Sequence, residues 1–321
     1  MNDLTFDALL NRAYQLYQME EYVQALDLLT REAGQFPEQA QTLYFWRMCL
    51  AARARRTALA IQLLEEALAA GHWYPEAQLR GEEDLEPLQG LAEFEKLVEV
   101  SRQRHAAVQA KAVPLLLTLE PEKESSADLP SPPLLLALHG NRSNARSAVD
   151  HWRPAVDLGW LLALPQSSQV GGPEVYIWDD RDWAEREIKE HYAALCEQEV
   201  FDPRRVVVGG FSLGGELAIW LALSGAVEAR GFIAVGPGGP LMREPDNWIP
   251  LIEAGRSRGL RGYIVLGEQD AFCYDSAQAL TQMLWARDIP CQLEVHPGLG
   301  HSFPREFRRS LARALEFVLR D

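Results

Sequence analysis

This chain has few cysteines, no excess of basic residues and no long apolar run, and each shortage excludes a class of protein. Its four cysteines, Cys49, Cys196, Cys273 and Cys291, form neither a C-x-x-C pair nor a disulfide framework. We therefore expect free thiols in a reducing compartment. The net charge of −15 argues against nucleic acid as a partner, because contacts to phosphates need a basic surface.

No apolar stretch approaches the roughly 18 residues that a membrane helix requires. The first residues, Met-Asn-Asp-Leu-Thr-Phe-Asp, are acidic and lack the cationic and apolar segments of a secretory signal. We therefore expect a cytoplasmic protein with no membrane span. A length of 321 residues with 47% hydrophobic residues is enough for two domains or one large one.

The spacing of apolar residues divides the chain into two parts. Residues 4–110 show only the three- and four-residue steps of amphipathic helices, with a turn near residues 20–22 and Pro37 closing the first helix pair. A second pair is expected at residues 42–54 and 57–70, capped by Gly71, and a third across residues 85–110. This spacing resembles a tetratricopeptide repeat. The sequence predicts an all-α domain over residues 1–110, which either docks a protein partner or buries one face on the following domain.

From residue 111 onward, short apolar strands alternate with helices, and this pattern predicts an α/β domain over residues 111–321. Its sheet should be doubly wound and mostly parallel, with function at the carboxyl ends of the strands. Residues 121–131 are polar and charged and should form a surface hairpin loop. The expected strands are 113–119, 133–138, 160–164, 174–178, 205–209, 231–235, 262–267 and 291–296, and the expected helices are 182–197, 213–224, 247–258, 274–287 and 305–319.

The most informative segment follows the strand at 205–209 and reads Gly210-Phe211-Ser212-Leu213-Gly214. A strand, a G-x-S-x-G turn and a helix in this order are typical of a nucleophile elbow, which exposes a serine hydroxyl on a sharp turn. Glycines at 210 and 214 leave room where a side chain would collide with the neighbouring strand or helix. Ser212 is therefore the candidate nucleophile, placed at a helix N-terminus that favours developing negative charge.

A serine nucleophile needs a base, and the base needs an acid to orient it. In this kind of fold the chain order is serine, acid, histidine. Asp270 follows the strand at 262–267 and is the candidate acid, with Glu268 and Asp275 as alternatives and a helix-capping role as the simpler explanation. His301 stands after Gly300 on the loop behind the last strand and is the candidate base, with His296 as the alternative.

The loop after an early strand should supply the second donor of an oxyanion hole. Here that loop is His139-Gly140-Asn141-Arg142-Ser143-Asn144. We expect the backbone N–H groups of Leu213 and Asn141 to hold the oxyanion. His139 and Gly140 should shape the turn, with Gly140 beside the substrate. Trp178 ends a strand on the same face and either lines a substrate pocket or packs on the sheet edge.

With these landmarks in order, residues from about 112 to the end resemble the α/β-hydrolase superfamily. The motif around Ser212 is similar to that of carboxylesterases, acyl-protein thioesterases and dienelactone-hydrolase-like esterases. The resemblance implies a Ser-His-Asp triad that transfers an acyl group to water, with no metal and no organic cofactor. The short link at residues 236–260 leaves no room for a large cap, which favours small ester substrates.

Two alternatives to an esterase remain at this point. The first is a serine peptidase on the same fold, although no signature for binding a peptide terminus is visible. The second is a helical-repeat adaptor with a catalytically inactive hydrolase scaffold, against which the intact set of candidate residues argues. The ratio of kcat/KM on an aryl ester to that on an amino-acyl amide distinguishes an esterase from a peptidase. A pull-down with residues 1–110 tests the adaptor.

Overall fold

The computed structural model describes residues 5–122, 131–198 and 200–320, which divide into two compact units. One, called the helical unit here, comprises Met1–Ala112 and the segment Val170–Val175. The other, called the sheet unit, comprises Val113–Gln169 and Tyr176–Asp321. Most of the loop expected at 121–131 lies outside the described residues. Among the residues that are described, no helix combines the length and the apolarity needed to cross a bilayer.

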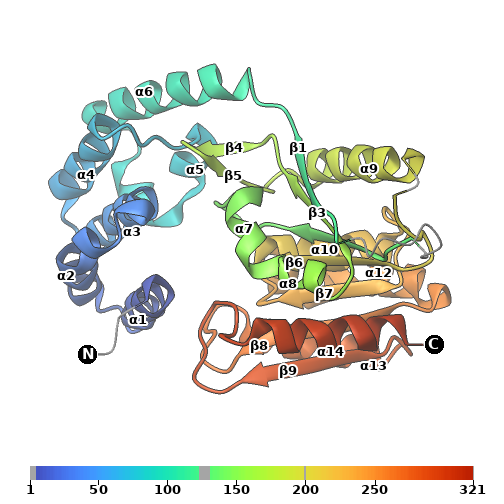
Figure 1. Cartoon of the computed structure of the whole chain (residues 1–321). Coiled ribbons are helices and arrows are strands. Elements are labelled where there is room, and N and C mark those ends of the chain that lie inside the picture. The colour runs from blue at the N-terminus through green and yellow to red at the C-terminus, as the bar shows by residue number, and fades with distance from the viewer. Residues whose placement is uncertain (1–4, 123–130, 199, 321) are drawn as a thin grey trace. The chain divides into compact units, whose positions relative to one another are not determined.

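The helical unit is built from successive helices that pack on one another along the chain (Figure 1, blue to teal). The first four match the two expected pairs, but the third expected pair is replaced by a short helix, a 3-10 helix containing Pro87 and one long helix. The elements are α1 (Phe6–Gln18), α2 (Tyr22–Glu32), η1 (Ala33–Gln35), η2 (Pro37–Gln39), α3 (Ala40–Arg53), α4 (Thr57–Ala69), α5 (Glu76–Gly81), η3 (Glu83–Leu88) and α6 (Ala92–Gln109). The tetratricopeptide-like repeat itself stays a prediction.

A short hairpin from the later part of the sequence belongs to the helical unit. Its strands β4 (Val170–Gly172) and β5 (Val175–Tyr176) form a separate two-stranded sheet. The Val170 N–H donates to Gln109 Oε1 at 2.9 Å, and Gln41 Nε2 donates to the Gly171 carbonyl at 3.3 Å. The expectation that residues 174–178 form a strand of the main sheet was therefore wrong, because this segment pairs locally.

The sheet unit contains a seven-stranded sheet in the order β1-β3-β2-β6-β7-β8-β9. The first strand runs antiparallel to its neighbour and the remaining pairs are parallel. This is the mostly parallel α/β sheet that the sequence predicted. The strands are β1 (Leu115–Leu119), β2 (Leu134–Leu138), β3 (Leu161–Gln166), β6 (Val206–Phe211), β7 (Gly231–Val235), β8 (Arg261–Gly267) and β9 (Cys291–His296).

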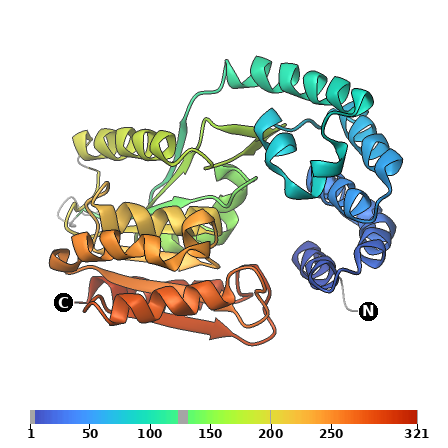
Figure 2. The same cartoon turned by 180° about the vertical axis from the view of Figure 1, so that it is seen from behind.

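Helices cover both faces of this sheet, which explains why its central strands are apolar throughout (Figures 1 and 2). In β2, Leu135 and Ala137 pack on one face, and Leu134, Leu136 and Leu138 on the other. The first face carries α7 (Ala145–Trp152), α8 (Pro154–Asp157) and α14 (Phe307–Leu319), and the second carries α9 (Arg181–Glu197), α10 (Leu213–Ser224), α12 (Ile249–Gly255) and α13 (Tyr274–Trp285).

The link between β7 and β8 contains no large inserted domain. The single helix expected at residues 247–258 is divided into η4 (Pro245–Trp248), α12 and η5 (Arg256–Arg258), and it is preceded by the short α11 (Pro240–Arg243). Prolines at the starts of η4, α11 and α12 cannot donate a backbone hydrogen bond, so each begins a new helical segment.

Candidate active site

Ser212 lies on the sharp turn between β6 and α10, with φ 53° and ψ −123°. A positive φ is strained for any residue other than glycine, and such strain persists only where surrounding contacts hold it. Here the Ser212 N–H donates to the Val235 carbonyl at 3.0 Å, and the Ser212 carbonyl accepts from Gly215 and Glu216 N–H at 2.9 and 3.0 Å. The neighbouring strand and the first turn of α10 therefore fix the serine backbone.

The two outer glycines of the motif are required by close backbone packing. A Cβ atom at Gly210 would stand 2.0 Å from the Gly214 carbonyl oxygen, and one at Gly214 would stand 2.3 Å from the His139 carbonyl oxygen. Both obstacles are backbone atoms, which cannot rotate away as a side chain can. The motif thus brings α10 against β6 and against the end of β2.

A chain of hydrogen bonds joins Ser212 to the expected base and acid. His301 Nε2 lies 3.0 Å from Ser212 Oγ, and His301 Nδ1 lies 2.8 Å from Asp270 Oδ2. Asp270 is 1% exposed, and its Oδ1 accepts the N–H groups of Phe272 and Cys273, both at 3.2 Å. The structure thus brings together three side chains from different loops at the carboxyl ends of the strands.

The alternative acid and base residues have other surroundings. His296 Nε2 lies 2.7 Å from Glu294 Oε1 at the end of β9. Glu268 accepts the Gly298 N–H at 3.0 Å. Asp275 lies in the first turn of α13. The hydrogen bonds at His301 therefore favour Asp270 and His301 over these alternatives.

The buried His139 side chain packs beneath the loop that follows β2, between this loop and the Trp178 ring. Its ring is 1% exposed and stacks on Trp178 with centroids 4.5 Å apart. His139 Nδ1 lies 2.8 Å from the Gly140 carbonyl oxygen, which can only accept, so Nδ1 carries the proton and Nε2 faces the Ser167 N–H at 3.4 Å. Burial lowers the pKa of His139 to about 4. The ring is thus neutral near pH 7 and serves as a structural support.

The Asn141 side chain fastens the same loop to the segment that follows β5. Its Oδ1 accepts the Trp178 N–H at 3.1 Å, and its Nδ2 donates to Asp179 Oδ1 at 3.1 Å. The Trp178 indole N–H donates to the His139 carbonyl at 2.9 Å. Three hydrogen bonds therefore hold the loop that contains the expected oxyanion donor Asn141.

The strand register places this loop beside the nucleophile. Leu138 at the end of β2 is paired with Gly210 of β6, so the residues that follow each strand are neighbours. The Asn141 loop and the Ser212-Leu213 turn are the two segments whose N–H groups the sequence predicted as oxyanion donors. Gly140, in the first of these segments, lies against Phe211. A Cβ atom at Gly140 would come within 2.8 Å of the Phe211 ring carbon Cδ1.

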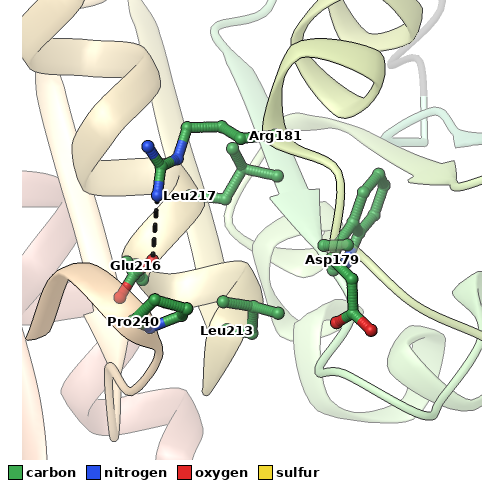
Figure 3. Close-up of a pocket in the computed structure, with 7 residues that line it drawn as sticks. Asp179, Arg181, Leu213, Glu216, Leu217 and Pro240 are labelled. Atoms are coloured by element: carbon green, nitrogen blue, oxygen red, sulfur yellow. Dashed lines mark ion pairs between the residues drawn. The ribbon is translucent and has the colours of Figure 1, made fainter. Parts of the chain in front are cut away.

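A cavity of about 120 Å³ opens next to Leu213 (Figure 3). Its apolar lining consists of Trp178, Leu213, Leu217 and Pro240, and its polar lining of Asp179, Arg181 and Glu216. Trp178 was expected either to line a pocket or to pack on the sheet, and at 3% exposure it does both.

Two charged residues of this cavity were missed in the sequence. Arg181 Nη2 lies 3.9 Å from Glu216 Oε1, and the dashed line in Figure 3 marks this ion pair. Glu216 is 2% exposed, and its Oε2 accepts the Met242 N–H at 2.9 Å. Burial raises the pKa of Glu216. The sequence could have indicated Glu216, because it is the one acidic residue in the otherwise apolar helix at 213–224.

Comparison with known proteins agrees with this architecture. Residues 5–109 match the model of the A/B hydrolase-like N-terminal domain, and residues 174–316 match the model of the dienelactone hydrolase family. An uncharacterized protein from Bacillus cereus ATCC 10987 is 27% identical, with 98% of this chain and 99% of that chain covered and a TM-score of 0.56. Esterase PE8 shares the fold at 17% identity, with 63% and 98% of the two chains covered and a TM-score of 0.51. No curated protein was found to match.

These observations define the fold and the families that the two parts of the chain resemble. The chain has the α/β-hydrolase fold, in which an all-helical N-terminal part precedes a mostly parallel sheet. Its N-terminal part is similar to the A/B hydrolase-like N-terminal domain, and the greater part of its sheet unit is similar to the dienelactone hydrolase family.

Proposed function

We propose that this chain is an esterase that hydrolyses small carboxylic esters or thioesters through a covalent acyl-enzyme. The observation that carries this proposal is the hydrogen-bonded series Ser212–His301–Asp270, with its distances of 3.0 and 2.8 Å. A strained serine on a strand-to-helix turn, beside an N–H-bearing loop at the end of the adjacent strand, is the arrangement that acyl transfer requires.

In the proposed mechanism, His301 Nε2 takes the proton of Ser212 Oγ as this oxygen attacks the carbonyl carbon. Asp270 holds the Nδ1–H tautomer of the ring and stabilises its positive charge. The tetrahedral intermediate then collapses, and His301 gives the proton to the departing alcohol or thiol. In the second half of the reaction, His301 takes a proton from water as this water attacks the acyl-enzyme, and it returns the proton to Ser212 Oγ when the acid is released.

The negative charge on the carbonyl oxygen would be stabilised by the backbone N–H groups of Leu213 and Asn141. Leu213 is the first residue of α10, a helix of 12 residues, whose N-terminal N–H groups carry partial positive charge. The three hydrogen bonds that hold the Asn141 loop support its role, because a preorganised donor does not have to reorganise during the reaction.

The cavity beside Leu213 supports a small substrate. Its volume of about 120 Å³ is small for a ligand pocket, and part of its wall is formed by Trp178 and other apolar side chains. Gly140 would lie next to the bound carbonyl group. We therefore expect short-chain esters to be better substrates than long-chain lipids.

The test is covalent labelling with a fluorophosphonate, followed by intact-mass measurement. Wild type should gain one adduct and Ser212→Ala none, while Ser302→Ala, which alters a serine next to His301, should still be labelled. Ser212→Ala should also lower kcat on an aryl ester by roughly 10⁴-fold or more. Labelling of Ser212→Ala equal to that of wild type would refute the assignment of the nucleophile.

Ester and amide substrates separate the esterase from a peptidase on the same fold. We expect kcat/KM for an aryl ester to exceed that for an amino-acyl amide with the same acyl group. A preference for the amide would assign the same residues to a peptidase.

A further inference from the structure

Cys273 stands directly behind the candidate base and has no part in the proposed mechanism. It precedes α13, and its Sγ lies 3.6 Å from His301 Nδ1, the atom that is also 2.8 Å from Asp270 Oδ2. The sulfur, nitrogen and oxygen atoms all lie within 4.8 Å of one another. Cys273 and Asp270 are 2% and 1% exposed. Three different ligand types therefore converge on one buried point.

A thiolate, an imidazole and a carboxylate are the ligand types that Zn²⁺ prefers in proteins. With bond lengths of about 2.3 Å to sulfur and 2.0 Å to nitrogen or oxygen, tetrahedral geometry puts sulfur and nitrogen about 3.6 Å apart and nitrogen and oxygen about 3.3 Å apart. The observed distance between Cys273 Sγ and His301 Nδ1 is 3.6 Å. The contact between Asp270 Oδ2 and His301 Nδ1, now 2.8 Å, must open by about half an ångström to admit the ion.

The backbone beside the three ligand atoms carries no side chains. A Cβ atom at Gly236 would lie 3.1 Å from Asp270 Oδ2 and 3.2 Å from His301 Nδ1, and one at Gly238 would lie 2.6 Å from Cys273 Sγ. A side chain at Gly238 would therefore collide with the sulfur atom, and one at Gly236 would crowd the oxygen and nitrogen atoms. Glycine at both positions thus keeps side-chain atoms of this segment away from the three ligand atoms.

The charges also balance. A divalent cation bound to one carboxylate, one thiolate and one neutral imidazole gives a site with no net charge, which lowers the cost of placing the ion in a buried position. A thiol must lose its proton to bind a metal, so the ion would replace that proton.

We propose that Asp270, Cys273 and His301 form an inhibitory binding site for a thiophilic divalent cation such as Zn²⁺. The metal bonds to His301 Nδ1, so the proton of that nitrogen moves by exchange with solvent to Nε2, and the Cys273 proton is released to water. His301 Nε2–H then has no lone pair to accept the proton of Ser212. The metal is an inhibitor here and not a cofactor.

The ion would enter past His301, whose side chain is 21% exposed and lies on the loop after β9. Because the ring must swing outward before Nδ1 is reached, inhibition should develop slowly. Mg²⁺, which prefers oxygen ligands and keeps its water shell, should have no such effect.

Binding is tested first, in a form that does not depend on catalysis. The Ser212→Ala variant keeps all three ligands, and titration with Cd²⁺ should produce the ultraviolet charge-transfer band of a cadmium thiolate. Addition of Cys273→Ser should abolish this band, because a hydroxyl is a poor ligand for a soft metal. The matched control is Cys49→Ser, because Cys49 with Glu82 and Asp84 is the other group of this kind among the described residues.

The inhibition of ester hydrolysis rests on the proposed function, and it is tested in the active enzyme with Zn²⁺. Cys273→Ser should raise the Zn²⁺ concentration for half-inhibition by at least roughly tenfold relative to its own uninhibited rate, and Cys49→Ser should leave it unchanged. Cys273→Ala is a second variant in case the serine perturbs folding.

An unchanged Cd²⁺ band in Cys273→Ser, or its loss in Cys49→Ser instead, would overturn the proposed site. Metal binding without an effect on the rate would overturn the inhibitory role alone. If ester hydrolysis were absent altogether, the binding titration would still decide whether the metal site exists, so the two proposals fail separately.

Discussion

Replacing Gly214 with alanine should impair catalysis without changing any of the proposed catalytic side chains. The new Cβ atom would stand 2.3 Å from the His139 carbonyl oxygen and 2.9 Å from the Leu138 carbonyl oxygen. Because both are backbone atoms at the end of β2, the start of the oxyanion loop must retreat by about 1 Å to restore a normal contact. The helix itself would tolerate alanine better than glycine, so its intrinsic preference opposes this damage.

The size of the effect follows from that displacement. Movement of the Asn141 N–H by about 1 Å removes one oxyanion donor from its position, and such a loss lowers kcat by roughly 10²- to 10³-fold. The collision should lower the free energy of unfolding by about 1–3 kcal/mol. KM should change less than kcat, because the substrate cavity is lined by other residues.

The assay is kcat and KM on p-nitrophenyl acetate, together with urea unfolding. The matched control is Gly215→Ala, whose nearest contact would be 3.2 Å to the Gly210 carbonyl oxygen and needs only a small adjustment. We expect this control to remain within about threefold of the wild-type rate. A folded Gly214→Ala variant with wild-type kcat would refute the argument that the close packing of α10 against β2 positions the oxyanion loop.

Three further predictions concern the acid, the buried histidine and the cavity. Asp270→Asn should lower kcat by roughly 10⁴-fold at unchanged thermal stability, whereas Glu268→Gln should stay within about twofold; equal rates in the two variants would contradict the choice of acid. The pKa of His139 falls from 6.5 to about 4 on folding, so between these pH values the unfolded state binds a proton that the folded state does not. This group should therefore raise the free energy of unfolding by about 3 kcal/mol between pH 4 and pH 6.5. Urea unfolding across that window should show a smaller rise for His139→Asn, and an unchanged slope would count against the buried neutral ring. Leu217→Phe should narrow the cavity and lower the kcat/KM ratio of p-nitrophenyl butyrate to acetate by about tenfold, so an unchanged ratio would place the acyl group elsewhere.

The segments that the sequence predicted best are those whose local pattern leaves little choice. The strand at 231–235 and the helix at 213–224 have the predicted bounds. A short apolar run that follows a glycine fits a buried strand, and a longer apolar run behind the Ser212 turn fits a helix. The segment at 174–178 also carries strand-forming residues, but its pairing depends on which partner is near. It forms a two-stranded sheet with β4, the strand just before it, and the Gly172-Pro173 turn between the two was a local hairpin signal that the expectation of a main-sheet strand did not use.

The charged groups of the cavity illustrate a second limit. Arg181 and Glu216 are 35 residues apart in sequence, and neither stands in a recognisable motif. Their approach to 3.9 Å results from the packing of α9 and α10 on the same face of the sheet. Cys273 is a similar case, because its nearness to His301 depends on how the loops after β8 and β9 meet.

The sequence by itself determined the class of fold, the candidate nucleophile and the order of the candidate residues along the chain. Strand-turn-helix patterning and the glycines around Ser212 are local properties, so they can be recognised in one segment at a time. The tertiary structure decided which of several acids and histidines share a hydrogen bond, which charges line the cavity and that a thiol stands behind the base. Those relations join residues from separate loops, and only the register and order of the strands bring such loops to the same edge of the sheet.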